Sequence, residues 1–191
     1  TGKPKGAELT HFNMFYNAEY VATSLFKQIT TVKALVTLPL FHSFGKTALQ
    51  NAAMHSGGTL VLLPRFDPAS AMGLIQKHKL TLFAGVPTMY FALLNFPDAG
   101  NFDLSSLQFC ISGGAAMPVE VMRAFDAKYN VNILEGYGLS ETSPVASFNS
   151  PDRPKKAGSI GLTIPRVEFR LEGPNGEVIT EPGVPGEICI K

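Results

Sequence analysis

The chain has 191 residues, of which 45% are hydrophobic and 16% are charged, and its formal net charge is +1. This composition is typical of a folded globular protein and excludes a disordered chain, and the charge gives no reason to expect nucleic acid as a partner. No apolar run approaches the ~18 residues that span a bilayer, so no transmembrane segment is predicted.

Most of the sequence alternates between helix and strand patterns. The first helix is expected from Thr10, a suitable N-cap, to about Phe26, because aromatic residues recur there at helical spacing. The expected strands cover 34–40, 59–63, 80–84, 107–111 and 131–134, and the later helices cover 44–55, 68–79, 87–94 and 118–129. Repeated strand–helix units predict an α/β fold with a mostly parallel sheet flanked by helices.

The pattern changes near residue 150. A polar, proline-rich connector over 150–156 precedes two expected strands, 167–171 and 177–180, which flank the hairpin signal Asn175-Gly176. The tail should therefore be the start of a small antiparallel β-barrel or sheet. Because the chain opens in a loop and closes within a strand pattern, we expect a central piece of a longer polypeptide. Its predicted parts are 1–33, a loop segment and helix left from a truncated subdomain; 34–150, an α/β subdomain; and 151–191, a partial β-barrel.

The two cysteines indicate a reducing compartment. Cys110 and Cys189 each lie in an apolar, strand-like run, with neither the spacing of a zinc site nor a disulfide framework. We expect unreactive, buried thiols in a cytoplasmic protein, with peripheral membrane association as an alternative.

The most informative stretch is residues 134–142, Leu-Glu-Gly-Tyr-Gly-Leu-Ser-Glu-Thr. Its glycines allow the backbone close to a ligand, Ser140 and Thr142 offer hydroxyls, and Glu141 offers a carboxylate of the kind that holds Mg²⁺. The segment should leave the strand 131–134 at its carboxyl end, where open α/β sheets bind ligands. For this segment alone, a simple turn is the alternative.

Three other strand ends carry small or polar residues. These are 41–45, 85–87 and 112–118, and in a parallel sheet they would lie along the same edge as 134–142. The opening segment 1–6, Thr-Gly-Lys-Pro-Lys-Gly, adds two cations and a hydroxyl suited to a triphosphate, although it lacks the ending of a Walker loop. A solvated basic linker is its alternative. Together these loops predict one ligand site.

Five motifs follow in order along nearly the whole chain: Thr-Gly-Lys-Pro-Lys-Gly, Leu-Pro-Leu-Phe-His-Ser-Phe-Gly, Ser-Gly-Gly-Ala-Ala-Met-Pro, Gly-Tyr-Gly-Leu-Ser-Glu-Thr and Gly-Glu-Ile-Cys-Ile-Lys. In this order they resemble the adenylate-forming superfamily of acyl-CoA synthetases, firefly luciferase and nonribosomal-peptide adenylation domains. Within this superfamily the chain looks most like a bacterial long-chain fatty-acid–CoA ligase. The resemblance implies that a carboxylic acid attacks the α-phosphate of MgATP, and that the thiol of coenzyme A then takes the acyl group.

The resemblance also implies residue roles. Glu141 would hold Mg²⁺, and Glu141, Thr142, Lys5 and His42 would be catalytic. The acid would lie against His42, Gly85, Val86 and Ala116. The nucleotide would contact Thr1, Gly2, Lys3, Lys5, Gly113, Gly114, Ala115, Glu135, Gly136, Tyr137, Gly138, Leu139, Ser140 and Thr142. Capping or core roles are the alternatives for His42 and Tyr137.

Some parts of the family pattern are missing. These are the lead-in to the phosphate loop, a downstream aspartate that grips the ribose, the hinge, and the mobile C-terminal lid with its catalytic lysine. We therefore predict no turnover by this polypeptide alone, and acid-dependent ATP–pyrophosphate exchange would contradict that prediction. Two other functions stay open: adenylation of an aryl or amino acid for a carrier-protein thiol, and a catalytically silent nucleotide-binding domain. An exposed sheet edge makes a homodimer a further hypothesis.

Overall fold

The computed structural model describes residues 2–191, so the expected role of Thr1 falls outside it. Its main helices are α1 (His11–Tyr20), α2 (Ala52–His55), α3 (Pro68–His78), α4 (Pro87–Leu94) and α5 (Val119–Tyr129). Shorter or irregular helical segments are η1 (Val21–Leu25), η2 (Phe26–Gln28), η3 (Phe44–Asn51), η4 (Ala99–Asn101) and η5 (Ser140–Thr142). The strands are β1 (Lys33–Val36), β2 (Thr59–Leu62), β3 (Leu82–Gly85), β4 (Phe109–Ser112), β5 (Ile133–Gly138), β6 (Val145–Phe148), β7 (Leu162–Thr163), β8 (Phe169–Glu172), β9 (Val178–Ile179) and β10 (Glu187–Ile190).

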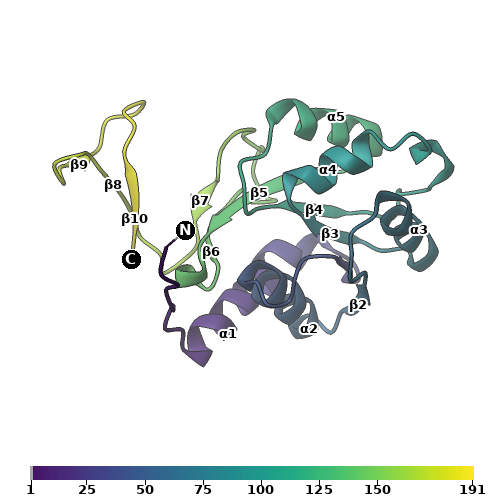
Figure 1. Ribbon diagram of the computed structural model, residues 1–191, viewed down its shortest axis with the longest axis horizontal. Coiled ribbons are helices and arrows are strands. Elements are labelled where there is room, and N and C mark those ends of the chain that lie inside the picture. Colours follow the sequence, from purple (N-terminus) through teal and green to yellow (C-terminus); the bar gives the residue numbers. More distant parts are fainter. Residues whose placement is uncertain (1) are drawn as a thin grey trace.

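A seven-stranded sheet in the order β2-β1-β3-β4-β5-β6-β7 forms the centre of the molecule (Figure 1). Strands β1 to β5 pair in parallel, and β6 and β7 add antiparallel strands at one edge. The predicted α/β class with a mostly parallel sheet is confirmed. The two edge strands were not predicted, because β7 has only two residues and the pairing of β6 with β5 is not visible in the local pattern.

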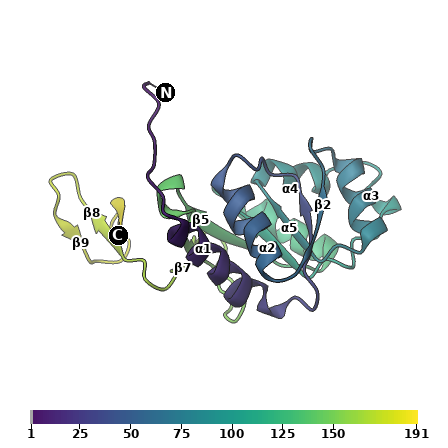
Figure 2. The same ribbon diagram turned by 90° about the horizontal axis from the view of Figure 1, so that it is seen from below.

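Helices cover both faces of the sheet. On one face α1 and α2 pack with η1 to η3, and on the other lie α3, α4 and α5 (Figures 1 and 2). Each face of the sheet packs against its helices in a separate hydrophobic core: the first core includes η1 to η3 and α2, and the second includes α3, α4 and α5. Side chains alternate between the two faces along β3, so Leu82 and Ala84 enter the first core and Phe83 enters the second. Cys110 is fully buried in the second core, and this burial, with a smaller contribution from Asp126, raises the pKa of its thiol well above the ordinary value. This cysteine is therefore a packing residue, as expected.

The predicted helix starts are confirmed at two capping residues. The Thr10 hydroxyl accepts from the Asn13 backbone N–H at 3.0 Å, and the Asn13 side chain accepts from the Thr10 N–H at 3.0 Å. The Asp67 carboxylate accepts from the Ser70 N–H at 2.8 Å, with Pro68 in the first turn. Beyond Tyr20 the first helix continues as a π-helical segment, η1, and then as a 3₁₀ turn, η2.

The tail forms a separate three-stranded antiparallel sheet in the order β10-β8-β9. The predicted hairpin closes at Gly173–Gly176, where the Gly176 N–H donates to the Gly173 carbonyl at 3.0 Å and Gly176 has a φ of +80°. Asn175-Gly176 thus occupies the last two positions of the turn, and Gly176 itself has the left-handed conformation. The Phe169 ring of β8 meets the Tyr137 ring of β5 edge-on, with 6.3 Å between centroids.

The division at residues 33 and 150 stays a prediction. Contacts cross both positions: Val21 and Leu25 share a core with β1 to β6, and Ile164 is buried in the same core. None of the helices among residues 2–191 is long and apolar enough to cross a membrane.

Candidate functional site

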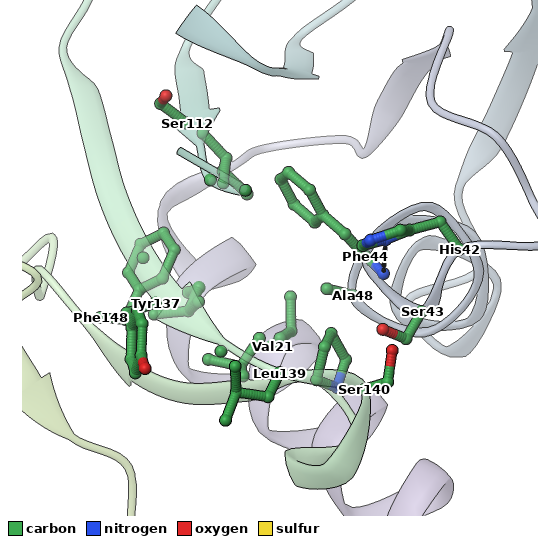
Figure 3. Close-up of a pocket in the computed structure, with 18 of the residues that line it drawn as sticks. Val21, His42, Ser43, Phe44, Ala48, Ser112, Tyr137, Leu139, Ser140 and Phe148 are labelled. Carbon is green, nitrogen blue, oxygen red and sulfur yellow. Dashed lines mark hydrogen bonds between the residues drawn. The ribbon is translucent and has the colours of Figure 1, made fainter. Parts of the chain in front are cut away.

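A cavity of about 330 Å³ opens at the carboxyl ends of β4 and β5 (Figure 3). Its walls come from the segments that the sequence predicted to converge: the start of η3, the loop after β4, and the stretch from β5 into η5. The predicted site residues in its lining are His42, Gly113, Gly114, Gly136, Tyr137, Gly138, Leu139, Ser140 and Glu141. The expectation that separate loops meet around one space therefore holds for these residues.

The cavity has a polar rim and an apolar floor. His42, Ser43, Ser140 and Glu141 provide the polar groups. Figure 3 shows His42, Ser43 and Ser140 on one side of the cavity and Tyr137 and Phe148 on the opposite side. The floor consists mainly of Val21, Leu25, Ala48, Ile111, Val145 and Phe148, with the buried Ser112 also in the lining. A single space can therefore hold a ligand with one charged and one hydrophobic end.

His42 has both a capping and a rim position. Its Nδ1 accepts a hydrogen bond from the Phe44 backbone N–H at 3.2 Å, which places the proton of the neutral ring on Nε2. The side chain is exposed and lines the cavity, so Nε2–H can donate to a ligand oxygen. Capping was the alternative role considered for His42. The capping bond orients the imidazole ring.

Ser43 is a rim residue that the sequence did not reveal. Its hydroxyl oxygen is buried, and among residues 2–191 it has no hydrogen-bond partner. A serine before a helix normally caps it from an extended conformation, but Ser43 is already helical, with φ −57° and ψ −31°, and caps nothing. From the sequence it is indistinguishable from an ordinary N-cap.

Glu141 and Thr142 differ in what their side chains do. The Thr142 hydroxyl accepts from the Leu139 N–H at 2.9 Å and hydrogen-bonds the carbonyls of Leu139 and Pro144, so it closes the η5 turn. The Glu141 carboxylate is exposed, and no hydrogen bond or ion pair within the described part of the chain engages it.

The residues present fit a magnesium ion that arrives with a nucleotide. Residues 2–191 contain no cluster of three His, Cys, Asp or Glu side chains that could hold a metal by themselves. Mg²⁺ is usually bound by one or two carboxylates together with substrate phosphates and water, and a single unengaged carboxylate at a cavity rim matches that pattern. Glu141 is the group that would hold it.

Two glycines of the stretch 134–142 are required by packing inside the protein. A Cβ at Gly136 would lie 2.4 Å from Cδ2 of Phe148, and a Cβ at Gly138 would lie 1.8 Å from the Pro144 carbonyl oxygen. Both residues belong to β5, which pairs in parallel with β4 up to Glu135 and then antiparallel with β6 from Gly136. The expectation that this segment leaves the strand as a loop is wrong, because the strand exchanges partners and continues to Gly138.

Other predicted site residues lie away from the cavity lining. Gly2, Lys3 and Lys5 belong to an exposed N-terminal segment that extends away from the body of the molecule (Figure 2). Gly85, Val86, Ala115, Ala116 and Thr142 are likewise not among the lining residues. Glu135 is buried: its Oε1 accepts from the Met117 N–H at 2.9 Å, while Oε2 has no partner among residues 2–191. Their proposed contacts with ligand stay predictions.

Asn17 is a second residue that the sequence did not single out. This α1 side chain is only 2% exposed and bonds to Val145, just after the η5 turn. The only available signal was a polar residue on the side of a helix that also carries buried residues.

The whole chain, residues 1–191, matches the model of the AMP-binding enzyme family. The chain belongs to this family. A long-chain-fatty-acid–CoA ligase of Bacillus subtilis (strain 168) is 41% identical, and a feruloyl-CoA synthase of Amycolatopsis sp is 35% identical. Both comparisons cover the whole of this AMP-binding chain. They cover only 34% and 38% of the two relatives, so the chain spans about a third of their length.

A solved structure of the family has the same fold. O-succinylbenzoate coenzyme A synthetase from Bacillus subtilis, in complex with ATP and magnesium ion, superimposes with a TM-score of 0.83 at 32% identity. The match covers 100% of this chain and 39% of that protein. The resemblance to adenylate-forming enzymes is thus confirmed at the level of family and fold.

Proposed function

We propose that this chain is the nucleotide- and acid-binding part of an AMP-forming fatty acid–CoA ligase. The observation that carries the proposal is the single cavity in which the glycine loop after β4, Tyr137, Glu141 and His42 meet above an apolar floor. The 41% identity to a long-chain-fatty-acid–CoA ligase supports the choice of acid.

The polar rim supplies groups for the first chemical step. An oxygen of the carboxylate attacks the α-phosphorus of ATP, the bond to the bridging oxygen breaks, and pyrophosphate leaves with the bonding electron pair. Glu141 would hold Mg²⁺, which would offset the negative charge on the phosphates. The Ser140 hydroxyl and the Nε2–H of His42 face the same space and orient phosphate and carboxylate oxygens by hydrogen bonds. Positioning and charge stabilisation are what transfer at phosphorus mainly requires.

Tyr137 and the glycine loop form the proposed adenine slot. Gly113 and Gly114 leave backbone at one wall of the cavity, and the half-buried Tyr137 contributes an aromatic ring that Phe169 supports edge-on. A flat base can stack against such a ring.

The apolar floor favours a hydrophobic acid. Val21, Leu25, Ala48 and Phe148 present no charge to a ligand, and the carboxylate in the lining, Glu141, lies at the rim. An α-amino group bound at the floor would lack a counter-charge among the described residues, which weighs against the amino-acid alternative. An aryl acid is the second candidate, because the chain is 35% identical to a feruloyl-CoA synthase and because Phe44 adds an aromatic wall.

The remaining expectations extend this proposal. Coenzyme A would be the acyl acceptor, and Lys3 and Lys5 would reach the phosphates with Thr1 and Gly2. Gly85, Val86, Ala115 and Ala116 would complete the adenine and acyl walls. The division into 1–33, 34–150 and 151–191, the homodimer, and a cytoplasmic location with or without membrane association belong to the same set of proposals.

Acid-dependent ATP–pyrophosphate exchange tests the function. The assay uses a protein of the relatives' full length that contains this chain, with fatty acids of graded length, aryl acids and amino acids. Exchange driven by fatty acids is expected, and the 191-residue chain alone should show none. Exchange driven only by aryl or amino acids would replace the proposed acid, and exchange with no acid would contradict the ligase.

A further inference from the structure

A buried amide links the first helix to the turn that carries Glu141. Asn17 of α1 is 2% exposed. Its Oδ1 accepts from the Val145 backbone N–H at 3.1 Å, and its Nδ2 donates to the Val145 carbonyl at 2.8 Å. Nδ2 also lies 3.4 Å from the Thr142 carbonyl oxygen. One side chain therefore satisfies backbone groups on both sides of Ser143-Pro144, 125 to 128 residues away.

These bonds hold the turn from the side opposite to β5. On the β5 side, Val145 pairs with Gly138, and the Leu139 N–H donates to the Pro144 carbonyl at 3.2 Å. On the other side the Asn17 amide acts as a short strand partner for Val145. The η5 turn is thus fixed between β5 and α1, and Glu141 lies in its middle.

We infer that Asn17 is a positioning residue that sets the place of the Glu141 carboxylate at the cavity rim. Among residues 2–191 no hydrogen bond or ion pair holds Glu141 itself, so its location depends on the backbone of the turn. Helix α1 begins at His11, shortly after segment 2–6, the proposed phosphate loop, so Asn17 also ties the η5 turn to the helix that follows this loop. This inference rests on the proposed function.

A positioning role and a merely structural role predict different binding data. Loss of a buried hydrogen-bonding group lowers stability in either case. A merely structural role would reduce the fraction of folded protein, and it would therefore lower the apparent affinity for every ligand alike. A positioning role lowers the affinity for a ligand that needs the metal and leaves a ligand without metal almost unaffected.

The test compares Asn17→Ala and Asn17→Asp with the control Tyr16→Phe in the 191-residue chain. Asn17→Asp keeps the acceptor for the Val145 N–H but replaces the donor to the Val145 carbonyl. Tyr16→Phe removes another long-range bond of α1, the 2.8 Å bond from the Tyr16 hydroxyl to the Pro165 carbonyl, which is made to the segment after β7 and not to the η5 turn. Affinities for MgATP and for AMP without metal are measured by calorimetry at a temperature at which all variants are folded.

The Asn17 variants should bind MgATP about 10-fold more weakly, in the range seen when groups behind a metal ligand are removed, with AMP affinity unchanged. Tyr16→Phe should change neither affinity. Equal losses for both ligands, or no loss for MgATP, would overturn the inference.

If the unaltered chain binds neither ligand, the proposed function fails for this chain, and the inference is decided by hydrogen exchange. Asn17→Ala should then speed exchange of the amides over 139–146, and Tyr16→Phe should not. Unchanged exchange over 139–146 would overturn the positioning role independently of nucleotide binding.

Discussion

At the scale of single residues, His42 caps the start of η3, although Ser43 stands at the usual capping position and caps nothing. The histidine accepts the Phe44 N–H, and the serine hydroxyl is left buried beside the cavity without a partner. His42 lines the cavity, and its role there stays a prediction. Ser43 could not be found, because the conformation of a helix start is set by its packing and not by the residue alone.

Replacing Ser43 by alanine should stabilise the chain. An unsatisfied buried hydroxyl costs about 1–3 kcal/mol, so Ser43→Ala should raise the free energy of unfolding by roughly 1 kcal/mol. The control is Ser56→Ala, which removes a bond of 3.0 Å from the Ser56 hydroxyl to the Ala52 carbonyl and should lower stability. Urea unfolding measures both changes, and a loss of stability in Ser43→Ala equal to that in Ser56→Ala would contradict the account.

Asp103 should make stability depend on pH in the acidic range. Hydrogen bonds from Ser105, and secondarily from Lys79, lower the pKa of this exposed carboxyl from 3.8 to about 2. A group with a lowered folded-state pKa contributes stability above its unfolded pKa and loses it as pH falls through the folded value. The thermal midpoint of the unaltered chain should therefore fall more steeply between about pH 4 and pH 2 than that of Asp103→Asn. Parallel curves for the two proteins would refute this.

At the scale of elements, β5 and its partner β6 explain the glycine motif. The sequence predicted the strand and its ligand-facing end but not its continuation, because β6 is a run of only four residues, Val145–Phe148, and its pairing with β5 is not visible in the local pattern. The need for glycine at 136 and 138 arises from Phe148 and Pro144, which come close only after the chain folds back. Local pattern does not encode such contacts.

Gly138→Ala should disrupt this pairing. The added Cβ would lie 1.8 Å from the Pro144 carbonyl oxygen, so the two backbones must separate, and we expect a loss of about 3 kcal/mol or more. Gly100→Ala is the matched control, because nothing lies within 4 Å of its Cβ position, and its effect should stay within about 1 kcal/mol. Similar unfolding midpoints for the two variants would show that β5 and β6 are not held as described.

At the scale of the whole molecule, the sequence predicted the parallel sheet and the convergence of its loops, since both follow from repeated strand–helix units. It did not predict how the connector 150–156 packs against the rest of the molecule. Lys27 pairs with Asp152, and Lys155 pairs with Asp126, so both ion pairs tie the connector 150–156 to helices earlier in the chain. The exposed lysines of segment 2–6, expected at the phosphates, extend away from the cavity in this structure.

The central claim is that the cavity between η3, β4 and β5 binds a magnesium nucleotide. Photolabelling of the 191-residue chain with 8-azido-ATP and Mg²⁺, followed by tryptic peptide mapping, tests it most directly. The account predicts label in the peptides 80–123 and 129–155, which carry Gly113 and Tyr137, and loss of that label when unlabelled ATP competes. Label confined to 6–27 and 47–65, the peptides that line the second surface cleft between α1 and α2, or no label that ATP displaces, would contradict it.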